Sequence, residues 1–142
     1  GTIQQSCTNE KCSTMNAGPE FTYLWQDTTR YPTPTEMTAP QYVDRLMEWA
    51  ESQINDDSLF PLTPGSGFPR DFHRRVSTIF RRFFRVYAHI YHSHLDDIKE
   101  FSADAHLNTC IKHFLFFCLE FKLIPDGELA PLKEVISSLT RE

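Results

Sequence analysis

The chain has 142 residues and a formal net charge of −5, with 14 Lys and Arg against 19 Asp and Glu. Its 40% hydrophobic and 23% charged residues argue against a disordered chain, and its length allows one domain with a real core but not two. The longest apolar run, residues 114–119, is far shorter than the ~20 residues of a spanning helix, which argues against an integral membrane protein.

The first part of the chain predicts loops and a single short strand. Residues 1–18 show no helical period and hold two cysteines in the segment CTNEKC. The alternation in residues 20–26 predicts a half-buried strand with one covered side, formed by Phe21, Tyr23 and Trp25. Two prolines in residues 28–38 then predict a loop.

A helix is predicted directly after Thr38, with Pro40 in its first turn. Proline is tolerated there because the amide protons of a first turn have no partner within the helix. The apolar stripe of this helix is expected to consist of Val43, Leu46, Met47, Ala50 and Ile54. The prolines and glycines of residues 60–69 predict a second loop.

A long amphipathic helix is predicted from Asp71 onward. At ~100° per residue, six apolar positions fall within about 80° of arc, namely Phe72, Val76, Ile79, Phe83, Tyr87 and Ile90. Arg74, Arg81 and Arg85 fall within about 40° on the opposite side. We therefore expect one covered face and one basic face.

Two more helices are predicted over residues 105–121 and 128–139. The first is expected to bury an aromatic-rich stripe of His113, Phe114, Phe117 and Phe121. The second is expected to bury Leu129, Leu132, Val135, Ile136 and Leu139. With no internal repeat and no βαβ alternation, the predicted class is mainly α with a small β element.

Arginine is concentrated in one segment of this acidic chain. Six arginines lie within residues 70–85, together with a single acidic residue, Asp71. Such a patch favours a discrete anionic ligand over a long polyanion, and a solvated helix face is the alternative. RNA binding is disfavoured, because the phenylalanines of this helix are expected opposite the arginines and not between them.

The four cysteines are predicted to fall into two groups. Cys110 and Cys118 lie in an apolar helix and are expected in the core. Cys7 and Cys12 lie in a polar loop, where they can form a disulfide or half of a zinc site.

Three histidines of the segment AHIYHSH, namely His89, His92 and His94, can supply the other half of a zinc site. Ideal helix geometry favours His89 with His92, whereas His89 and His94 lie about 140° apart around a regular helix. Motifs of catalysis, such as GxSxG, HExxH or a phosphate-cradling glycine loop, are absent from the sequence.

Several segments together resemble the Mob (Mps one binder) family of kinase coactivators. They are FRVYAHIYHSH (84–94), AHLNT (105–109), TAPQYVDRLMEW (38–49) and the Cys7–Cys12 pair followed by MNAGPEFTYLW (15–25). The segment VYAHIYH favours the Mob1-like branch over the phocein branch. The resemblance implies one Mob domain over residues 1–142, with a four-helix-bundle core, a small β element and an N-terminal loop stapled by zinc.

The resemblance also implies site residues. The zinc ligands of the family fall on Cys7, Cys12, His89 and His94, which implies one structural Zn²⁺. This set requires either that the helix distort near residues 90–94 or that the loop approach from an unusual side. Its phosphopeptide pocket falls on Arg81, Arg82 and Arg85. No catalytic residues are implied. One departure is the segment Tyr31-Pro32-Thr33-Pro34, where relatives often carry lysines.

The function implied is that of a non-catalytic coactivator and scaffold in a Hippo- or mitotic-exit-type pathway of the cell cycle. It implies binding to NDR/LATS-type kinases and to phosphorylated upstream kinases or scaffolds, without nucleic acid or membrane insertion. The expected location is the cytoplasm, with the nucleus and spindle poles as further sites. The alternative is a zinc-dependent hydrolase with His92 as its base.

The family's acidic kinase-contacting residues lie in an arm that would precede Gly1. We therefore expect an N-terminally truncated domain that binds kinases weakly and phosphopeptides normally.

Overall fold

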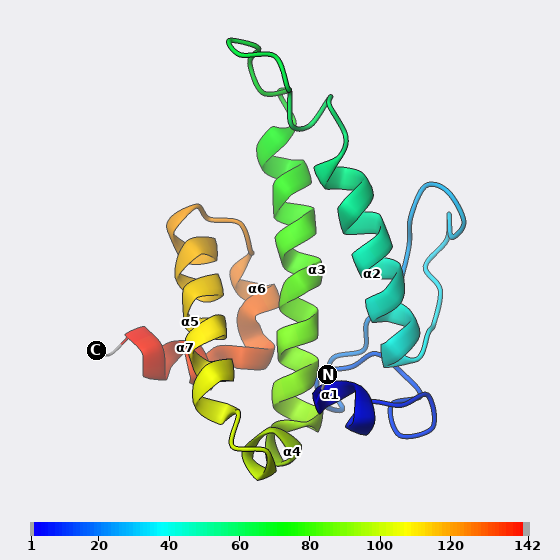
Figure 1. The fold of residues 1–142 in the computed structure, drawn as a ribbon, viewed down its shortest axis with the longest axis vertical. Helices are drawn as coiled ribbons and strands as arrows, with labels where there is room; N and C mark the ends of the chain where they lie inside the picture. The colour runs from blue at the N-terminus through cyan, green and yellow to red at the C-terminus, as the bar shows by residue number, and fades with distance from the viewer. Residues whose placement is uncertain (1, 141–142) are drawn as a thin grey trace.

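The computed structural model describes residues 2–140, except for the side chains of Thr2 and Thr140. Its helices are α1 (Thr2–Ser6), α2 (Ala39–Ile54), α3 (Phe72–Ser93), α4 (Leu95–Glu100), α5 (Asp104–Glu120), α6 (Asp126–Leu129), the 3-10 helix η1 (Ala130–Leu132) and α7 (Lys133–Thr140). Figure 1 shows α3 in the middle, with α2 on one side and α5 on the other. The prediction of a mainly helical fold is confirmed.

The predicted strand over residues 20–26 is wrong in its detail. Within the described residues, the pairing there consists of two isolated antiparallel bridges, Asn16 with Thr22 and Trp25 with Thr35. The expected alternation in burial nevertheless holds, since Phe21, Tyr23 and Trp25 are more buried than the residues between them. Their side chains pack against helices and not against a neighbouring strand. The short helix α1 was not expected from the sequence.

The beginning of α2 agrees with the sequence. The Thr38 hydroxyl accepts a hydrogen bond from the Gln41 N–H at 3.2 Å, and the Gln41 side chain accepts one from the Thr38 N–H at 3.1 Å. This reciprocal cap satisfies two donors that a helix start leaves without partners. The buried stripe differs in part, since Met47 and Ile54 are exposed while Ala39, Tyr42, Leu46 and Ala50 are buried.

Helix α3 contributes to three clusters of buried side chains, the third of which joins its Ile90 to Ile98 and Leu107. Phe84 and Ala88 pack in the first cluster with α5 and the C-terminal segment. The second cluster joins Met15 and Trp25 to α2, and Phe83 packs against it. Because α3 is covered from two directions, the prediction of one covered face is too simple. Phe84 and Ala88 lie outside the predicted stripe and are fully buried.

The predictions for the last two helices also need correction, the first in its buried face and the second in its continuity, although the apolar face predicted for residues 128–139 is confirmed. In α5 the buried side chains are Leu107, Ile111, Leu115 and Cys118, whereas His113 is exposed and Phe117 and Phe121 are about half exposed. Helix α5 is apolar on most sides, so periodicity could not identify the covered face. Cys110 is only half-buried, contrary to the core position expected for it. The helix predicted over 128–139 is divided at η1, which contains Pro131.

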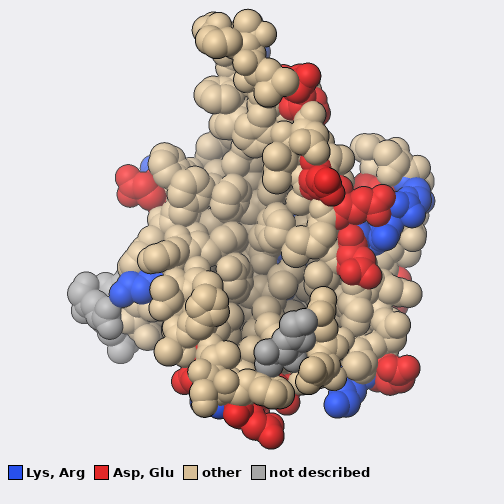
Figure 2. Space-filling view, viewed as in Figure 1, with Lys and Arg blue, Asp and Glu red and all other residues tan. Residues whose placement is uncertain are grey.

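The surface is unevenly charged on the face drawn in Figure 2. Acidic side chains gather along α2, and the centre of this face, over α3 and α5, carries hardly any charge. Among the described residues, no helix combines the length and the apolar character that a membrane crossing requires.

Candidate metal centre and arginine site

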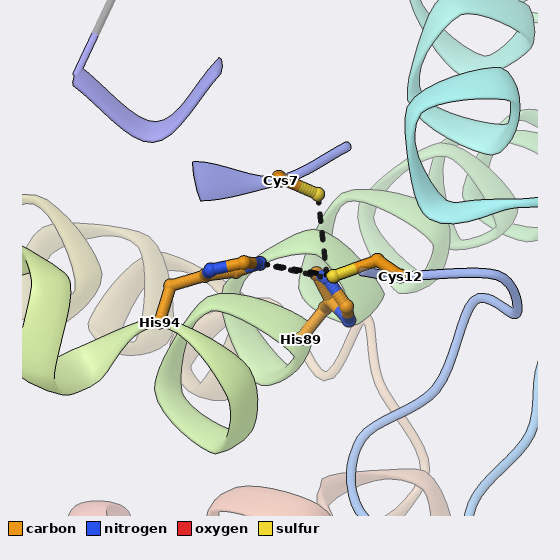
Figure 3. A group of neighbouring side chains, drawn as sticks. All are labelled: Cys7, Cys12, His89 and His94. Carbon is orange, nitrogen blue, oxygen red and sulfur yellow. Dashed lines mark hydrogen bonds between the residues drawn. The ribbon is translucent and has the colours of Figure 1, made fainter. Parts of the chain in front are cut away.

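Four potential metal ligands meet at the lower end of α3. One ligand atom from each of Cys7, Cys12, His89 and His94 lies within 4.8 Å of all the others. Cys7 Sγ lies 3.6 Å from His89 Nε2, Cys12 Sγ lies 3.4 Å from His94 Nε2, and the two Nε2 atoms are 3.2 Å apart. Figure 3 shows all four side chains pointing toward one centre. The set could hold a metal ion.

The end of α3 explains why His94 and not His92 joins the set. The helix ends at Ser93, and His94 has φ −132° and ψ 9°, so it lies between α3 and α4 and outside the regular spiral. The distortion implied near residues 90–94 is therefore a helix break. His92 Nε2 is instead 2.8 Å from the Pro131 carbonyl oxygen, and its ring lies against Gly18. A hydrolase with His92 as its base finds no support in this arrangement.

Outer contacts orient both imidazoles. His89 Nδ1 lies 2.8 Å from the Asn16 carbonyl oxygen, and His94 Nδ1 lies 3.3 Å from Asp97 Oδ2. Because a carbonyl or carboxylate oxygen accepts the Nδ1 proton, Nε2 is left free to bind a metal.

The electrostatics of the centre favour a bound cation. The pKa of the Cys7 thiol is raised to about 12, mainly by burial and in addition by the neighbouring Cys12. Burial lowers the pKa of His89, which keeps its imidazole neutral. Two adjacent thiolates need a positive partner, and a metal ion supplies one. Both cysteines are free thiols, so the disulfide alternative is not the one adopted.

Three arginines of α3 form a second site, which we call the arginine site: Arg81, Arg82 and Arg85. The Arg82 guanidinium lies over two indole rings that contact each other edge to face, 4.6 Å from the centroid of Trp25 and 4.3 Å from that of Trp49. Arg85 Nη1 donates to the Tyr42 hydroxyl at 2.8 Å, and its guanidinium lies 4.9 Å from the Tyr23 ring centroid. These contacts hold the cations in place without neutralising them.

Arg81 is held by Thr78 and by an acid. Its Nη2 donates to the Thr78 hydroxyl at 3.1 Å, and its Nη1 lies 3.5 Å from Glu128 Oε1. Arg81 Nε and Arg82 Nη1 are buried and have no acceptor among the described residues. Burial also lowers the pKa of Arg82. The arginine site therefore contains buried N–H donors whose hydrogen bonds are not satisfied by the described residues.

The six arginines of residues 70–85 thus do not form one solvated face. Arg74 is exposed and pairs with Asp71 at 3.0 Å, and Arg75 pairs with Asp56 at 2.6 Å. Sequence reasoning missed the two indoles and Glu128, because their positions in the chain lie far from the arginines and carry no pattern of their own.

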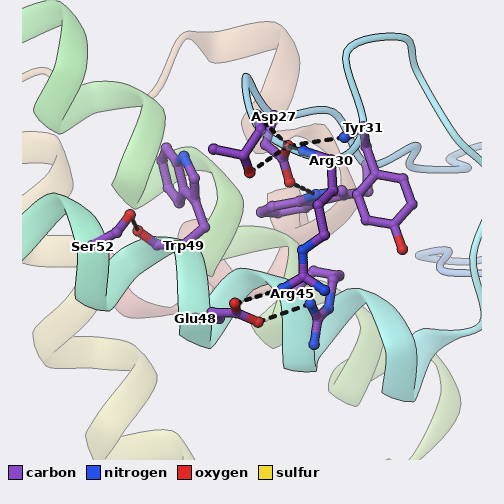
Figure 4. A network of polar contacts seen from close by, with 9 residues as sticks. Asp27, Arg30, Tyr31, Arg45, Glu48, Trp49 and Ser52 are labelled. Atoms are coloured by element: carbon purple, nitrogen blue, oxygen red, sulfur yellow. Dashed lines mark hydrogen bonds and ion pairs between the residues drawn. The ribbon is translucent and has the colours of Figure 1, made fainter.

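Figure 4 shows the turn that contains Asp27, Arg30 and Tyr31. The Asp27 side chain also positions the Trp25 ring. Asp27 Oδ1 accepts the backbone N–H of Thr29, Arg30 and Tyr31 at 2.8–3.0 Å, and Oδ2 accepts Trp25 Nε1–H at 2.8 Å. Desolvation by itself raises the pKa of Asp27, but the hydrogen bonds outweigh it and hold that pKa well below its usual range.

Replacing Asp27 with Asn should lower the free energy of unfolding by about 1–2 kcal/mol at pH 7, because an amide N–H would face the Trp25 donor. Since the folded-state pKa is lowered, the stabilisation is present above the unfolded pKa of about 4 and is lost as the pH falls through the folded value. Urea unfolding at pH 7, 5 and 3.5, with exposed Asp57→Asn as the control, measures the difference. If half of the difference in the free energy of unfolding between the unmodified protein and Asp27→Asn were already lost at pH 5, this would contradict the lowered pKa of Asp27.

Comparison with known proteins gives consistent matches. The family model described as the Mob1/phocein family matches residues 1–132. Over 139 residues and 98% of this chain, identity is 52% to "MOB kinase activator-like 1B" of Arabidopsis thaliana and 50% to a protein of the same name from Medicago sativa subsp. falcata. It is 48% over 141 residues and 99% of this chain to "MOB kinase activator-like 1 homolog A" of Dictyostelium discoideum. The chain spans 65–66% of the length of these curated relatives.

Proposed function

The chain belongs to the Mob1/phocein family, and we propose that it is a non-catalytic kinase coactivator whose arginine site binds a phosphorylated segment of a partner. One observation carries the binding proposal. Arg81 Nε and Arg82 Nη1 are buried donors without an acceptor among the described residues, beside a third cation, Arg85. The names of its relatives as MOB kinase activator-like proteins support the coactivator role.

A phosphate group has the charge and shape that these donors require. It carries about −1.5 to −2 charges at pH 7 and three acceptor oxygens. Guanidinium groups bind such oxygens through paired, charge-assisted hydrogen bonds. Because the indoles of Trp25 and Trp49 already hold Arg82, binding costs little further side-chain entropy there.

We extend the proposal to the metal, which we take to be one structural Zn²⁺. Zinc bonds of ~2.3 Å to sulfur and ~2.0 Å to nitrogen place tetrahedral ligand atoms about 3.3–3.8 Å apart. Three of the six separations between the ligand atoms are 3.2–3.6 Å, close to this spacing, and all six lie within 4.8 Å. Four protein ligands leave no open position for a catalytic water, and the ion would tie the Cys7–Cys12 loop to α3.

The partner kinases in this proposal are of the NDR/LATS type, in a Hippo- or mitotic-exit-type pathway, and this part rests on the family alone. Cytoplasmic residence, with the nucleus and spindle poles as further sites, belongs to the same proposal and also rests on the family alone.

Calorimetric titration tests the binding proposal. The probe is a short peptide of alanine, glycine and lysine with one phosphothreonine, and the control is the same peptide with threonine. We expect micromolar affinity for the phosphorylated peptide and affinity at least about tenfold weaker for the other, because charge-assisted bonds contribute ~1.5–3 kcal/mol each. Equal affinities would contradict the proposal.

A further inference from the structure

Glu128 places a negative charge inside the arginine site. Its Oε1 lies 3.5 Å from Arg81 Nη1, which is longer than the ~2.7–2.9 Å of a strong charge-assisted bond. Its Oε2 is buried and has no hydrogen-bond donor among the described residues. The carboxylate is therefore held close to Arg81 but is poorly satisfied.

The charge of Glu128 reaches the other side of the site as well. The pKa of Tyr23 is raised to about 12, mainly by burial, while Arg85 lowers it and Glu128 raises it. The Tyr23 ring in turn lies under the Arg85 guanidinium. An anion bound among the three arginines would thus be within the field of the Glu128 carboxylate.

We propose that Glu128 is a built-in counter-ion of the arginine site, which an incoming phosphate must displace from Arg81 in order to bind. This proposal rests on the phosphopeptide binding proposed above. In the free protein the Arg81–Glu128 pair reduces the electrostatic repulsion among the three neighbouring arginines. On binding, separating Arg81 from Glu128 subtracts from the affinity for any anion that uses Arg81. The Arg81–Glu128 pair therefore lowers the affinity of the site for anions. A phosphate overcomes this loss more readily than a single carboxylate does, because it has a larger charge and additional acceptor oxygens.

The expected consequence is a gain of affinity on removing the charge. Glu128→Gln should bind the phosphothreonine peptide about three- to tenfold more tightly than the unmodified protein. It should also raise the affinity for a peptide with glutamate in place of phosphothreonine. Asp126→Asn is the matched control, since Asp126 is exposed, lies in the same helix and has no ion pair with Arg81 among the described contacts; it should change either affinity less than twofold.

Two measurements keep a purely structural role of Glu128 apart from the proposed one. If Glu128 only positions Arg81, a folded Glu128→Gln variant binds the phosphothreonine peptide equally or more weakly, and the proposal is overturned. In the unmodified protein, saturating phosphothreonine peptide should shift both the Arg81 Nε–H resonance and the Glu128 side-chain carboxyl ¹³C resonance. A shift at Arg81 without one at Glu128 would overturn only the counter-ion role, whereas absence of any binding would overturn the proposed function with it.

Discussion

Replacing Cys12 with Ser should remove the proposed Zn²⁺ and lower the free energy of unfolding by about 4 kcal/mol, because loss of a structural metal is one of the few changes with effects of that size. Cys12 is buried, and its backbone is bonded to the Thr8 carbonyl at 2.8 Å and to the Ala39 N–H at 3.0 Å. Its loop therefore connects the metal centre to the start of α2. Releasing the loop should loosen the second cluster, which contains both Met15 and Trp25.

Elemental analysis and thermal unfolding measure this effect. A loss of about 4 kcal/mol corresponds to a decrease in Tm of roughly 8–16 °C for a chain of this size. The matched control is Cys110→Ser, a half-buried thiol outside the centre, which should retain the metal and most of the stability. A chelator should destabilise the unmodified protein and the control but not Cys12→Ser. Unchanged metal content in Cys12→Ser would refute the assignment of the centre.

Replacing Arg82 with Ala should weaken binding of the phosphothreonine peptide by roughly 10- to 150-fold, since a hydrogen-bonded charge contributes ~1.5–3 kcal/mol. The loss has two physical sources. A buried donor of the site disappears, and the faces of Trp25 and Trp49 lose the cation that covers them. Arg82→Lys should lose most of the same affinity, because an ammonium neither stacks as a plane nor donates as a fork.

Titration calorimetry of three variants with the phosphorylated and unphosphorylated peptides decides this prediction. Arg74→Ala is the matched control, because Arg74 lies on the same helix with its side chain 76% exposed and pairs only with Asp71 among the described contacts. It should leave the affinity almost unchanged. If Arg82→Ala weakened both peptides equally, the role of Arg82 would be structural. Circular dichroism checks that each variant is folded.

Local features of the sequence determined where two main helices begin and which residues are candidate metal ligands. Thr38 and Pro40 marked the start of α2, and the long apolar period beginning near Asp71 marked α3, because caps and periodicity act over one or two turns. The residue types also sufficed to single out the Cys7–Cys12 loop and the histidines of the segment AHIYHSH as candidate ligands. These features depend on neighbours in the chain, so they can be read without the fold.

Contacts between distant segments decided the rest. Ideal helix geometry favoured His92, and the resemblance implied His94; the break after Ser93 brings His94 to the centre. The strand predicted over 20–26 did not form beyond isolated bridges, because its covered side chains pack on helices. The face that α5 buries was likewise settled by α3 and the C-terminal segment, since a helix that is apolar on most sides has no periodicity to indicate it.

The arginine site shows the same division most clearly. The sequence by itself determined that α3 carries a cluster of cations, because their spacing along one helix is a local property. Only the tertiary structure decided that Arg82 lies over the rings of Trp25 and Trp49 and that Glu128 lies beside Arg81. These partners come from a loop, from α2 and from α6, and their approach depends on how the first two buried clusters pack against α3. Packing of that kind is a property of the whole fold, and no local pattern in the chain encodes it.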